Sequence, residues 1–378
     1  NYAAVQNIIT KGRSDNPEAS FFVLNINNPE GKLDMSNVRV EKNNNGDAGA
    51  TFNTDVSGGS RPIGILFQSS GVGRRLLLNC HVQSMPNNGV YWNGGAGRAV
   101  ACTADNNAVS NFRVSTDDVQ YISCVSGHDT NPWGVADSEL TYRGFWLFNG
   151  YGTARDCKAL FNYDVGQGAY IVDGESYGVL ENCQADVSVS RQALNVAPAN
   201  STGDEPVRVV GGVYRTSAGG ETERWLLRTN RSGTEFDGVQ VEAVSGAPTD
   251  RKGLLMNGAN CISEGGRYRA DNTAIEAEGD NSVIRNPKNI VGTNGIVTDA
   301  ADVDLRAIPN TATITAIGTR DRWNGVIGGG PIGGFDLSTV TGQYVGDEAM
   351  SNGTNTTAYL HAQWTGSAWQ PSDGGPTI

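Results

Sequence analysis

The sequence predicts an all-β protein, a parallel β-helix followed by a small C-terminal β-rich module. The first observation is composition: the 378-residue chain holds 50 glycines, and valine, isoleucine, threonine, asparagine and aspartate are frequent. These residues favour short strands separated by many turns. The second and third observations are two short motifs that recur in step along most of the chain. Recurring motifs of this kind indicate a stacked repeat.

The first motif opens a strand and is usually a glycine followed by three mostly apolar residues, as in GVYW and GFWL. It starts at Gly64, Gly89, Asn111, Gly144, Gly168, Ala193, Arg224, Gly253 and Ala274. The intervals run from 21 to 33 residues, which indicates constant strands joined by turns of variable length. The spaced leucines of leucine-rich repeats are absent, and β-propeller blades need about 40 residues or more. The motif therefore predicts β-helix coils that bury their apolar sides by stacking.

The second motif places a cysteine slot at a corresponding point in successive coils. The slot is filled by Cys80, Cys102, Cys124, Cys157 and Cys183, and we expect it to pass to Gly212, Gly238 and Gly265. Stacked strands lie ~4.8 Å apart, so a repeated slot forms a ladder inside the coil. Parallel side chains in one column are poorly placed for disulfides, which predicts buried free thiols. Cys261 lies outside this ladder.

The chain is expected to divide into three regions. Residues 1–63 contain the runs FFVLNIN and NVRVEKN and should supply lead-in strands and an N-terminal cap. Residues 64–305 contain both motifs and should form the β-helix body. Residues 306–378 include a glycine-rich connector and should form the C-terminal β-rich module.

The charge pattern limits the partners. The net charge is -12, and only six of the 28 basic residues are lysines. This balance argues against a nucleic-acid partner, which needs clustered basic residues. An acidic, lysine-poor surface favours a high-salt environment, where ions screen its self-repulsion; an ordinary, mildly acidic extracellular protein is the alternative. The longest apolar runs are a few residues, so we expect no membrane insertion.

The coils from Gly64 to Asp304 resemble the pectate-lyase-like right-handed β-helix family, which includes polysaccharide lyases, glycosidases and viral tailspikes. The stretch RDRWNGVIGGGPIGGFDLSTVTGQYVGDEAMSNGTNTTAYLHAQWTGSAWQPSDG resembles the C-terminal parts of β-helix proteins from tailed viruses of halophilic archaea. The resemblance implies an extracellular virion surface protein that attaches to host glycans or glycoproteins and contacts other virion proteins. A polysaccharide lyase or glycoside hydrolase is the alternative that it implies.

A column of outward side chains is the predicted ligand site. The second and fourth residues of each opening should face the core and the third should face outward. In four neighbouring coils the outward residues are Tyr91, Arg113, Trp146 and Tyr170. Aromatic rings offer flat apolar faces to a sugar ring, and arginine binds carboxylate or sulfate groups bidentately. The column therefore predicts a glycan site. A subunit interface of a homo-oligomer, or a floor covered by loops, is an equal alternative.

The longest turn flanks this column and runs from Ser126 to Tyr142. It contains His128 and Trp133, which we add to the predicted ligand site because long loops on a rigid scaffold often carry function.

Enzymes of this fold class use paired carboxylates, so the resemblance makes Asp117, Asp129, Asp137 and Glu139 the candidates for a catalytic pair. In an acidic protein such carboxylates are more often solvated surface, and the prediction therefore leans to attachment without catalysis. Asp299, Asp302 and Asp304 form the run DAADVD, which would suit a calcium or magnesium ion but lacks the glycine spacing of an EF-hand loop. No other cofactor is expected.

Overall fold

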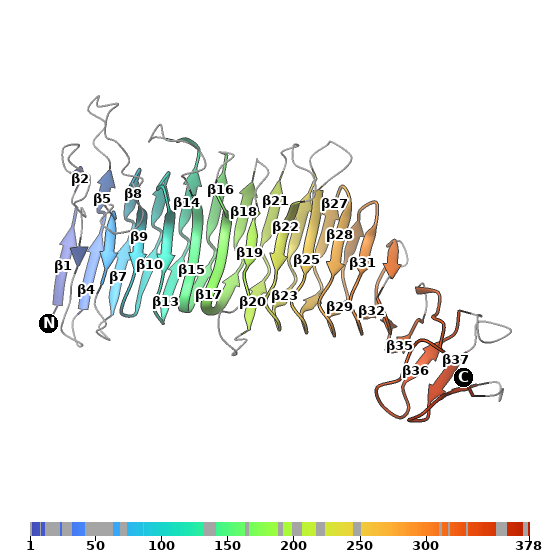
Figure 1. Ribbon diagram of the computed structural model, residues 1–378. Helices are drawn as coiled ribbons and strands as arrows, with labels where there is room; N and C mark the ends of the chain where they lie inside the picture. The colour runs from blue at the N-terminus through green and yellow to red at the C-terminus, as the bar shows by residue number, and fades with distance from the viewer. Residues whose placement is uncertain are drawn as a thin grey trace.

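The structure is a computed structural model. It describes residues 2–7, 9–11, 23–24, 32–41, 63–68, 74–85, 87–131, 141–162, 166–187, 192–198, 206–216, 224–244, 251–309, 312–316, 318–329, 332–352, 361–372 and 377–378. Within these residues the chain forms β-strands and no α-helix, as the composition predicts. Figure 1 shows the strands stacked side by side from the N-terminal to the C-terminal end of the array.

Three ladders of parallel strands run along the stack, and each repeat up to residue 298 supplies one strand to each ladder in turn. The first ladder comprises β1 (Tyr2–Gln6), β4 (Lys32–Ser36), β7 (Arg75–Leu78), β10 (Gly97–Val100), β13 (Val119–Ile122), the second halves of β15 (Arg143–Arg155) and β17 (Gly168–Glu181), β20 (Val207–Val210), β23 (Glu235–Asp237), β26 (Ile262–Glu264), β29 (Val283–Arg285), β32 (Asp304–Arg306) and β34 (Arg322–Trp323).

The second ladder comprises β2 (Ile9–Lys11), β5 (Arg39–Glu41), β8 (His81–Gln83), β11 (Thr103–Asp105), β14 (Val125–His128), β16 (Lys158–Phe161), β18 (Gln184–Val187), β21 (Val213–Thr216), β24 (Gln240–Ala243), β27 (Arg267–Ala270) and β30 (Asn289–Val291). The third comprises β3 (Val23–Leu24), β6 (Ile65–Phe67), β9 (Asn88–Trp92), β12 (Ser110–Val114), the first halves of β15 and β17, β19 (Leu194–Val196), β22 (Arg224–Thr229), β25 (Arg251–Met256), β28 (Thr273–Ala277), β31 (Gly295–Thr298) and β33 (Ile314–Ala316).

Alternating burial explains why these short segments form strands. In β9, Trp92 is buried and its neighbour Tyr91 is half-buried on the other face. The next strand of the ladder, β12, pairs in register and places Arg113 beside Tyr91. Inward-facing apolar residues of successive repeats join into one hydrophobic cluster that runs from Leu33 to Ile308. No single repeat encloses these side chains, so stacking supplies the core.

The corner between the first and second ladders repeats one backbone conformation. Its first residue has positive φ, a region that favours asparagine and glycine. The residues at this position include Asn37, Asn79, Ala101, Ser123, Asp156, Asn182, Gly211, Gly238 and Gly265. Asn79 Nδ2 donates a hydrogen bond to Asn37 Oδ1 at 2.8 Å, which ties one corner to the next.

The next residue after the corner fills the cysteine slot. All five predicted ladder cysteines are buried and free, as is Cys261, which confirms the expected thiols. Cys124 Sγ donates to the carbonyl oxygen of Ala99 in the preceding repeat at 3.3 Å. The expected continuation is right for Gly212 but wrong for Gly238 and Gly265, which occupy the positive-φ corner. The backbone hydrogen bonds place Val239 and Gly266 in the slot instead.

The two ends of the stack differ. Before residue 64, β1 pairs in parallel with β4 and β4 with β7, so these strands continue the ladders of the body. At the other end, parallel pairing continues through β34, and antiparallel pairing then joins β34 to β35 (Val326–Ile327). Antiparallel pairs also join β36 (Glu348–Met350), β37 (His361–Trp364) and β38 (Trp369–Pro371), which Figure 1 shows beyond the stack. The boundaries at residues 63 and 305 stay predictions.

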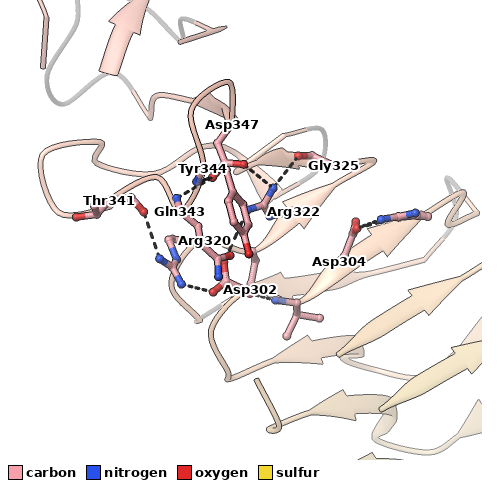
Figure 2. Close-up of polar contacts among 12 residues, drawn as sticks. Asp302, Asp304, Arg320, Arg322, Gly325, Thr341, Gln343, Tyr344 and Asp347 are labelled. Carbon is pink, nitrogen blue, oxygen red and sulfur yellow. Dashed lines mark hydrogen bonds and ion pairs between the residues drawn. The ribbon is translucent and has the colours of Figure 1, made fainter. Parts of the chain in front are cut away.

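A second hydrophobic cluster and an ion-pair network accompany the C-terminal strands. The cluster includes Ile327 and Trp369, whose indole Nε1 donates to the Val340 carbonyl at 2.6 Å. Figure 2 shows the network: Asp302 pairs with Arg320, and Arg322 Nη1 lies 3.4 Å from Asp347 Oδ1. Two arginines therefore connect the last parallel repeats to the loop that ends at Asp347.

Candidate ligand-binding face

The third-ladder side chains that face away from the main core form a continuous column, in which Leu66, Trp146, Ile171 and Leu255 are nevertheless buried. Pairing between successive strands places one residue of each repeat in line, in the order Leu66, Tyr91, Arg113, Trp146, Ile171, Asn195, Arg228, Leu255, Glu276, Val297 and Thr315. The N-terminal part of this column is aromatic and cationic. Three of the four residues predicted to form the column, Tyr91, Arg113 and Trp146, lie together there.

Arg113 is the centre of an aromatic cluster. Its guanidinium carbon lies 4.0 Å from the Trp146 ring centroid, 4.5 Å from that of Tyr91 and 5.1 Å from that of Phe148. Each such cation–π contact contributes about 0.5–2 kcal/mol, more where water is excluded. Tyr91 is itself oriented by its hydroxyl, which donates to Asn93 Oδ1 at 2.9 Å. The rings thus hold the guanidinium in a fixed plane.

Arg143, which sequence reasoning missed, is the second cation of this cluster. Its guanidinium carbon lies 3.8 Å from the Trp146 ring centroid. Its Nε donates to Gln167 Oε1 at 2.7 Å, and its Nη1 donates to Thr141 Oγ1 at 3.3 Å. The residue stands immediately before the GFWL motif, so the motif gave no reason to place it on the outward face.

The environment of the two arginines disfavours their charge. Burial lowers the pKa of Arg143 to about 10, and repulsion from Arg113 adds to this effect while Asp173 opposes it. Burial also lowers the pKa of Arg113. Both side chains remain cationic at neutral pH, and neither forms an ion pair with a carboxylate of the described residues. The cluster is therefore a largely buried site of positive charge.

Tyr170 does not belong to this column, and the prediction for it is wrong. The structure pairs Phe145 with Tyr170 and Trp146 with Ile171, so the GAYI motif is displaced by one residue from GFWL. A one-residue shift moves every side chain to the other face of a strand. Tyr170 is fully buried and its ring stacks on Phe145 at 5.1 Å.

His128 is also a core residue, contrary to prediction. It is fully buried, and its ring stacks on Tyr142 at 4.3 Å and meets the edge of Phe161 at 4.5 Å. Burial lowers the pKa of His128 to about 3, so the imidazole is neutral at physiological pH. Trp133, the other loop residue of the predicted site, lies outside the described residues.

The carboxylates proposed for catalysis do not meet as a pair. Asp117 lies at the turn after β12, where its Oδ1 accepts a hydrogen bond from the Tyr151 backbone N–H at 2.8 Å. Asp129 lies at the turn after β14 and accepts from Asn162 Nδ2 at 2.8 Å. A third-ladder strand of five residues separates these two corners by roughly 16 Å, whereas glycosidase carboxylates lie about 5–10 Å apart. Asp137 and Glu139 lie outside the described residues.

The aspartates proposed for metal binding have other partners. Asp302 pairs with Arg320, and Asp304 Oδ2 accepts from Arg306 Nη2 at 2.5 Å. Figure 2 shows these side chains pointing to arginines, while Asp299 is exposed on the surface. Within the described part of the chain, no three His, Cys, Asp or Glu side chains are grouped so as to hold a metal ion. These three aspartates do not form the predicted set of ligands.

A further polar cluster lies at the C-terminal part of the same face and was not predicted. Lys252 Nζ is 4.9 Å from the Trp225 ring centroid and 4.0 Å from Glu276 Oε2. Burial raises the pKa of Glu276, while Lys252 lowers it and the carboxylates of Glu278 and Asp299 raise it. Only the register of the third ladder brings these residues together.

Comparison with protein families, curated proteins and solved structures gives no match to this chain. In the described part of the chain, no helix has the length and apolar character needed to cross a membrane.

Proposed function

We propose that this protein is a right-handed parallel β-helix that binds glycans through the outward face of its third ladder, and that it serves as an attachment protein on a virion surface. The observation that carries the glycan proposal is the cluster of Tyr91, Arg113, Trp146 and Phe148. Its members come from three neighbouring repeats of a rigid array, so their spacing is set by the backbone pairing.

The chemistry of the cluster suits a sugar. Pyranose rings present apolar C–H faces that pack on aromatic rings, and their hydroxyl groups accept hydrogen bonds from guanidinium N–H donors. Strands of one ladder repeat every ~4.8 Å, so a linear glycan lying along the column would contact equivalent positions of successive repeats. Hydrogen-bonded strands position side chains better than loops do, which suits a preformed binding face.

The assignment to a virion rests on the sequence. The acidic, lysine-poor composition and the C-terminal stretch from Arg320 to Gly374 resemble β-helix proteins of viruses that infect halophilic archaea. A stack of parallel strands that ends in a small antiparallel module is consistent with a surface projection. The other virion proteins and a homo-oligomeric state belong to this proposal as well.

Binding of the labelled protein to intact haloarchaeal cells tests the proposal. Cells treated with periodate, which cleaves vicinal diols of sugars, should lose most of the bound protein, whereas mock-treated cells should retain it. Trp146→Phe keeps an aromatic ring in the column and should bind better than Trp146→Ala. Equal binding before and after periodate treatment would refute a glycan receptor.

One observation favours the enzymatic alternative, a glycan-cleaving activity. Glu276 has a raised pKa and lies beside Glu278, as in a pair of carboxyl groups with an acid and a base role. Incubation with surface polysaccharide and an assay for new reducing ends or unsaturated sugars tests this alternative. Product formation that is lost in Glu276→Gln would favour the enzyme, and its absence would leave attachment as the function.

A further inference from the structure

The guanidinium of Arg113 has an unusual set of contacts. Three aromatic rings surround it within about 5 Å, yet its Nε is buried and has no hydrogen-bond partner in the described structure. A guanidinium carries five N–H donors, and a buried donor without a partner is destabilising. Stacking uses the flat faces of the group and provides no acceptor for its N–H edges. The residue is therefore held in place by its faces while its donors are unused.

The side chains next to Arg113 also have N–H donors or positive charge without a matching acceptor. The indole Nε1 of Trp146 is a second buried donor that has no hydrogen-bond partner among the described residues, in a side chain that is only 8% exposed. Arg143 uses Nε and Nη1 on the neutral acceptors Gln167 and Thr141 and adds a second positive charge. Asp173 attracts Arg143 but forms no ion pair with it. The cluster thus combines two cations with unused donors, and none of the described residues forms an ion pair that would neutralise it.

Other arginines of the chain show how it neutralises such charges elsewhere. On the first ladder, Arg155 Nη2 lies 2.7 Å from Glu181 Oε2, and Arg208 Nε lies 2.8 Å from Glu235 Oε2. Both of these pairs join adjacent repeats, which makes a carboxylate one strand away the ordinary partner of an outward arginine. In the third ladder the residues on either side of Arg113 are Tyr91 and Trp146, so this position lacks the usual partner.

We propose that Arg113, Arg143 and Trp146 form a subsite for an oxyanion, and that the bound glycan carries a sulfate ester or a carboxylate group at this position. The proposal rests on the proposed glycan-binding function, because it names the chemical group that the same face would recognise. Either group offers two or three oxygens in the geometry that a guanidinium fork binds bidentately. A neutral sugar would satisfy the donors but not the two charges.

Dextran, dextran sulfate and carboxymethyl dextran provide probes with one backbone and different charge. Immobilised protein should bind at least one of the two anionic dextrans and not dextran, at about 0.1 M salt where screening is moderate. Arg113→Gln should lower this affinity by about tenfold or more, the loss of a charge-assisted hydrogen bond. Arg113→Lys keeps the positive charge but loses the two parallel N–H donors of the guanidinium, so its affinity should lie between those of the wild type and Arg113→Gln. Preference for the sulfated or the carboxymethylated polymer identifies the group.

Arg155→Gln is the matched control, because it makes the same charge change on an exposed side chain of another ladder. It should alter affinity by less than about twofold. An equal effect of both substitutions would mean that the polymers respond to overall charge, and would overturn the subsite. Inorganic sulfate should displace the bound polymer from the wild-type protein better than chloride at equal ionic strength. That measurement needs no variant, and failure of sulfate to compete would also overturn the proposal.

Binding to cell-surface polysaccharide separates this inference from the proposed function. Carboxyl reduction and desulfation remove the acidic groups and leave the sugar backbone. If the treated polysaccharide still binds the wild-type protein and Trp146→Ala abolishes that binding, the glycan function stands and the oxyanion subsite falls. If neither treated nor untreated polysaccharide binds, the glycan function is refuted. The dextran series then decides on its own whether the oxyanion subsite exists.

Discussion

Asp321 should make the C-terminal junction sensitive to pH. Its side chain is fully buried, Thr298 Oγ1 donates to its Oδ2 at 2.5 Å, and the Val303 backbone N–H donates to its Oδ1 at 3.2 Å. Burial raises the pKa of Asp321 to about 6, the two hydrogen bonds oppose that rise, and the nearby carboxylates of Asp302 and Asp299 add to it. At neutral pH the protein therefore buries an ionised carboxylate at this point.

The expected magnitude follows from the difference in pKa between folded and unfolded chains. The ordinary value is 3.8 and the folded value is about 6, and each pKa unit is worth about 1.4 kcal/mol, so the group contributes up to ~3 kcal/mol. Because the folded pKa is the higher one, this stability is fully present below about pH 4. It is lost as the pH rises through about 6. Asp321→Asn does not titrate and should lack this loss.

Hydrogen exchange of the junction strands, measured in both proteins between pH 4 and pH 8, reports the local stability. After correction for the intrinsic pH dependence of exchange, the opening free energy of the wild type should fall with rising pH relative to that of Asp321→Asn, by about 2–3 kcal/mol. The comparison cancels the titration of other carboxylates. A difference that stays constant from pH 4 to pH 8 would refute a raised pKa for Asp321 and the burial that causes it.

Three further predictions concern the core and the assembly. The ladder cysteines should resist alkylation until the protein unfolds, and Cys102→Ser should cost about 1–3 kcal/mol because a hydroxyl replaces a buried thiol; disulfides within the ladder would contradict this account. Tyr170→Ala should lower the free energy of unfolding by about 3–5 kcal/mol, as expected for a buried aromatic residue. Tyr91→Ala, at a half-buried position, should lower it by about 1 kcal/mol. Equal losses would mean that the strand register is wrong. Deletion of residues 325–378, which removes the second hydrophobic cluster, should convert a homo-oligomer to monomers by light scattering at high salt, and an unchanged mass would contradict a role in assembly.

The all-β class and the parallel stacking followed from the sequence because stacking imposes one pattern on successive repeats, and the inward positions were predicted correctly as far as Leu147. Each ladder cysteine directly follows a corner residue with positive φ, so the cysteines recur at the same point of successive repeats. The spacing of the cysteines in the sequence was therefore enough to predict the ladder as far as Cys183. Beyond that point glycine occupies the corner, and at Gly211–Gly212 and Gly265–Gly266 it occupies the slot as well, so sequence could not distinguish the two positions.

The candidate site was predicted less completely, since a site on stacked strands depends on register. Tyr170 follows a glycine that resembles earlier openings, yet its ring continues the stack of Phe112 and Phe145 in the core. A strand with apolar residues on both faces, such as GAYIV, fits either register, so only neighbouring repeats select one. Arg143 and Lys252 were missed for a related reason, because their aromatic partners are defined by contacts in space and not by the motif.

Affinity for a surface glycan, compared between Tyr91→Ala and Tyr344→Ala, tests the central proposal most directly. Both changes remove a tyrosine ring; Tyr91 lies in the outward column, and Tyr344 is 66% exposed on the C-terminal loop. We expect Tyr91→Ala to weaken binding by about tenfold, as for loss of an aromatic contact with a ligand and with Arg113, while Tyr344→Ala binds as the wild type does. Unchanged binding by Tyr91→Ala, with binding lost in Tyr344→Ala, would place the site on the C-terminal module and contradict the account.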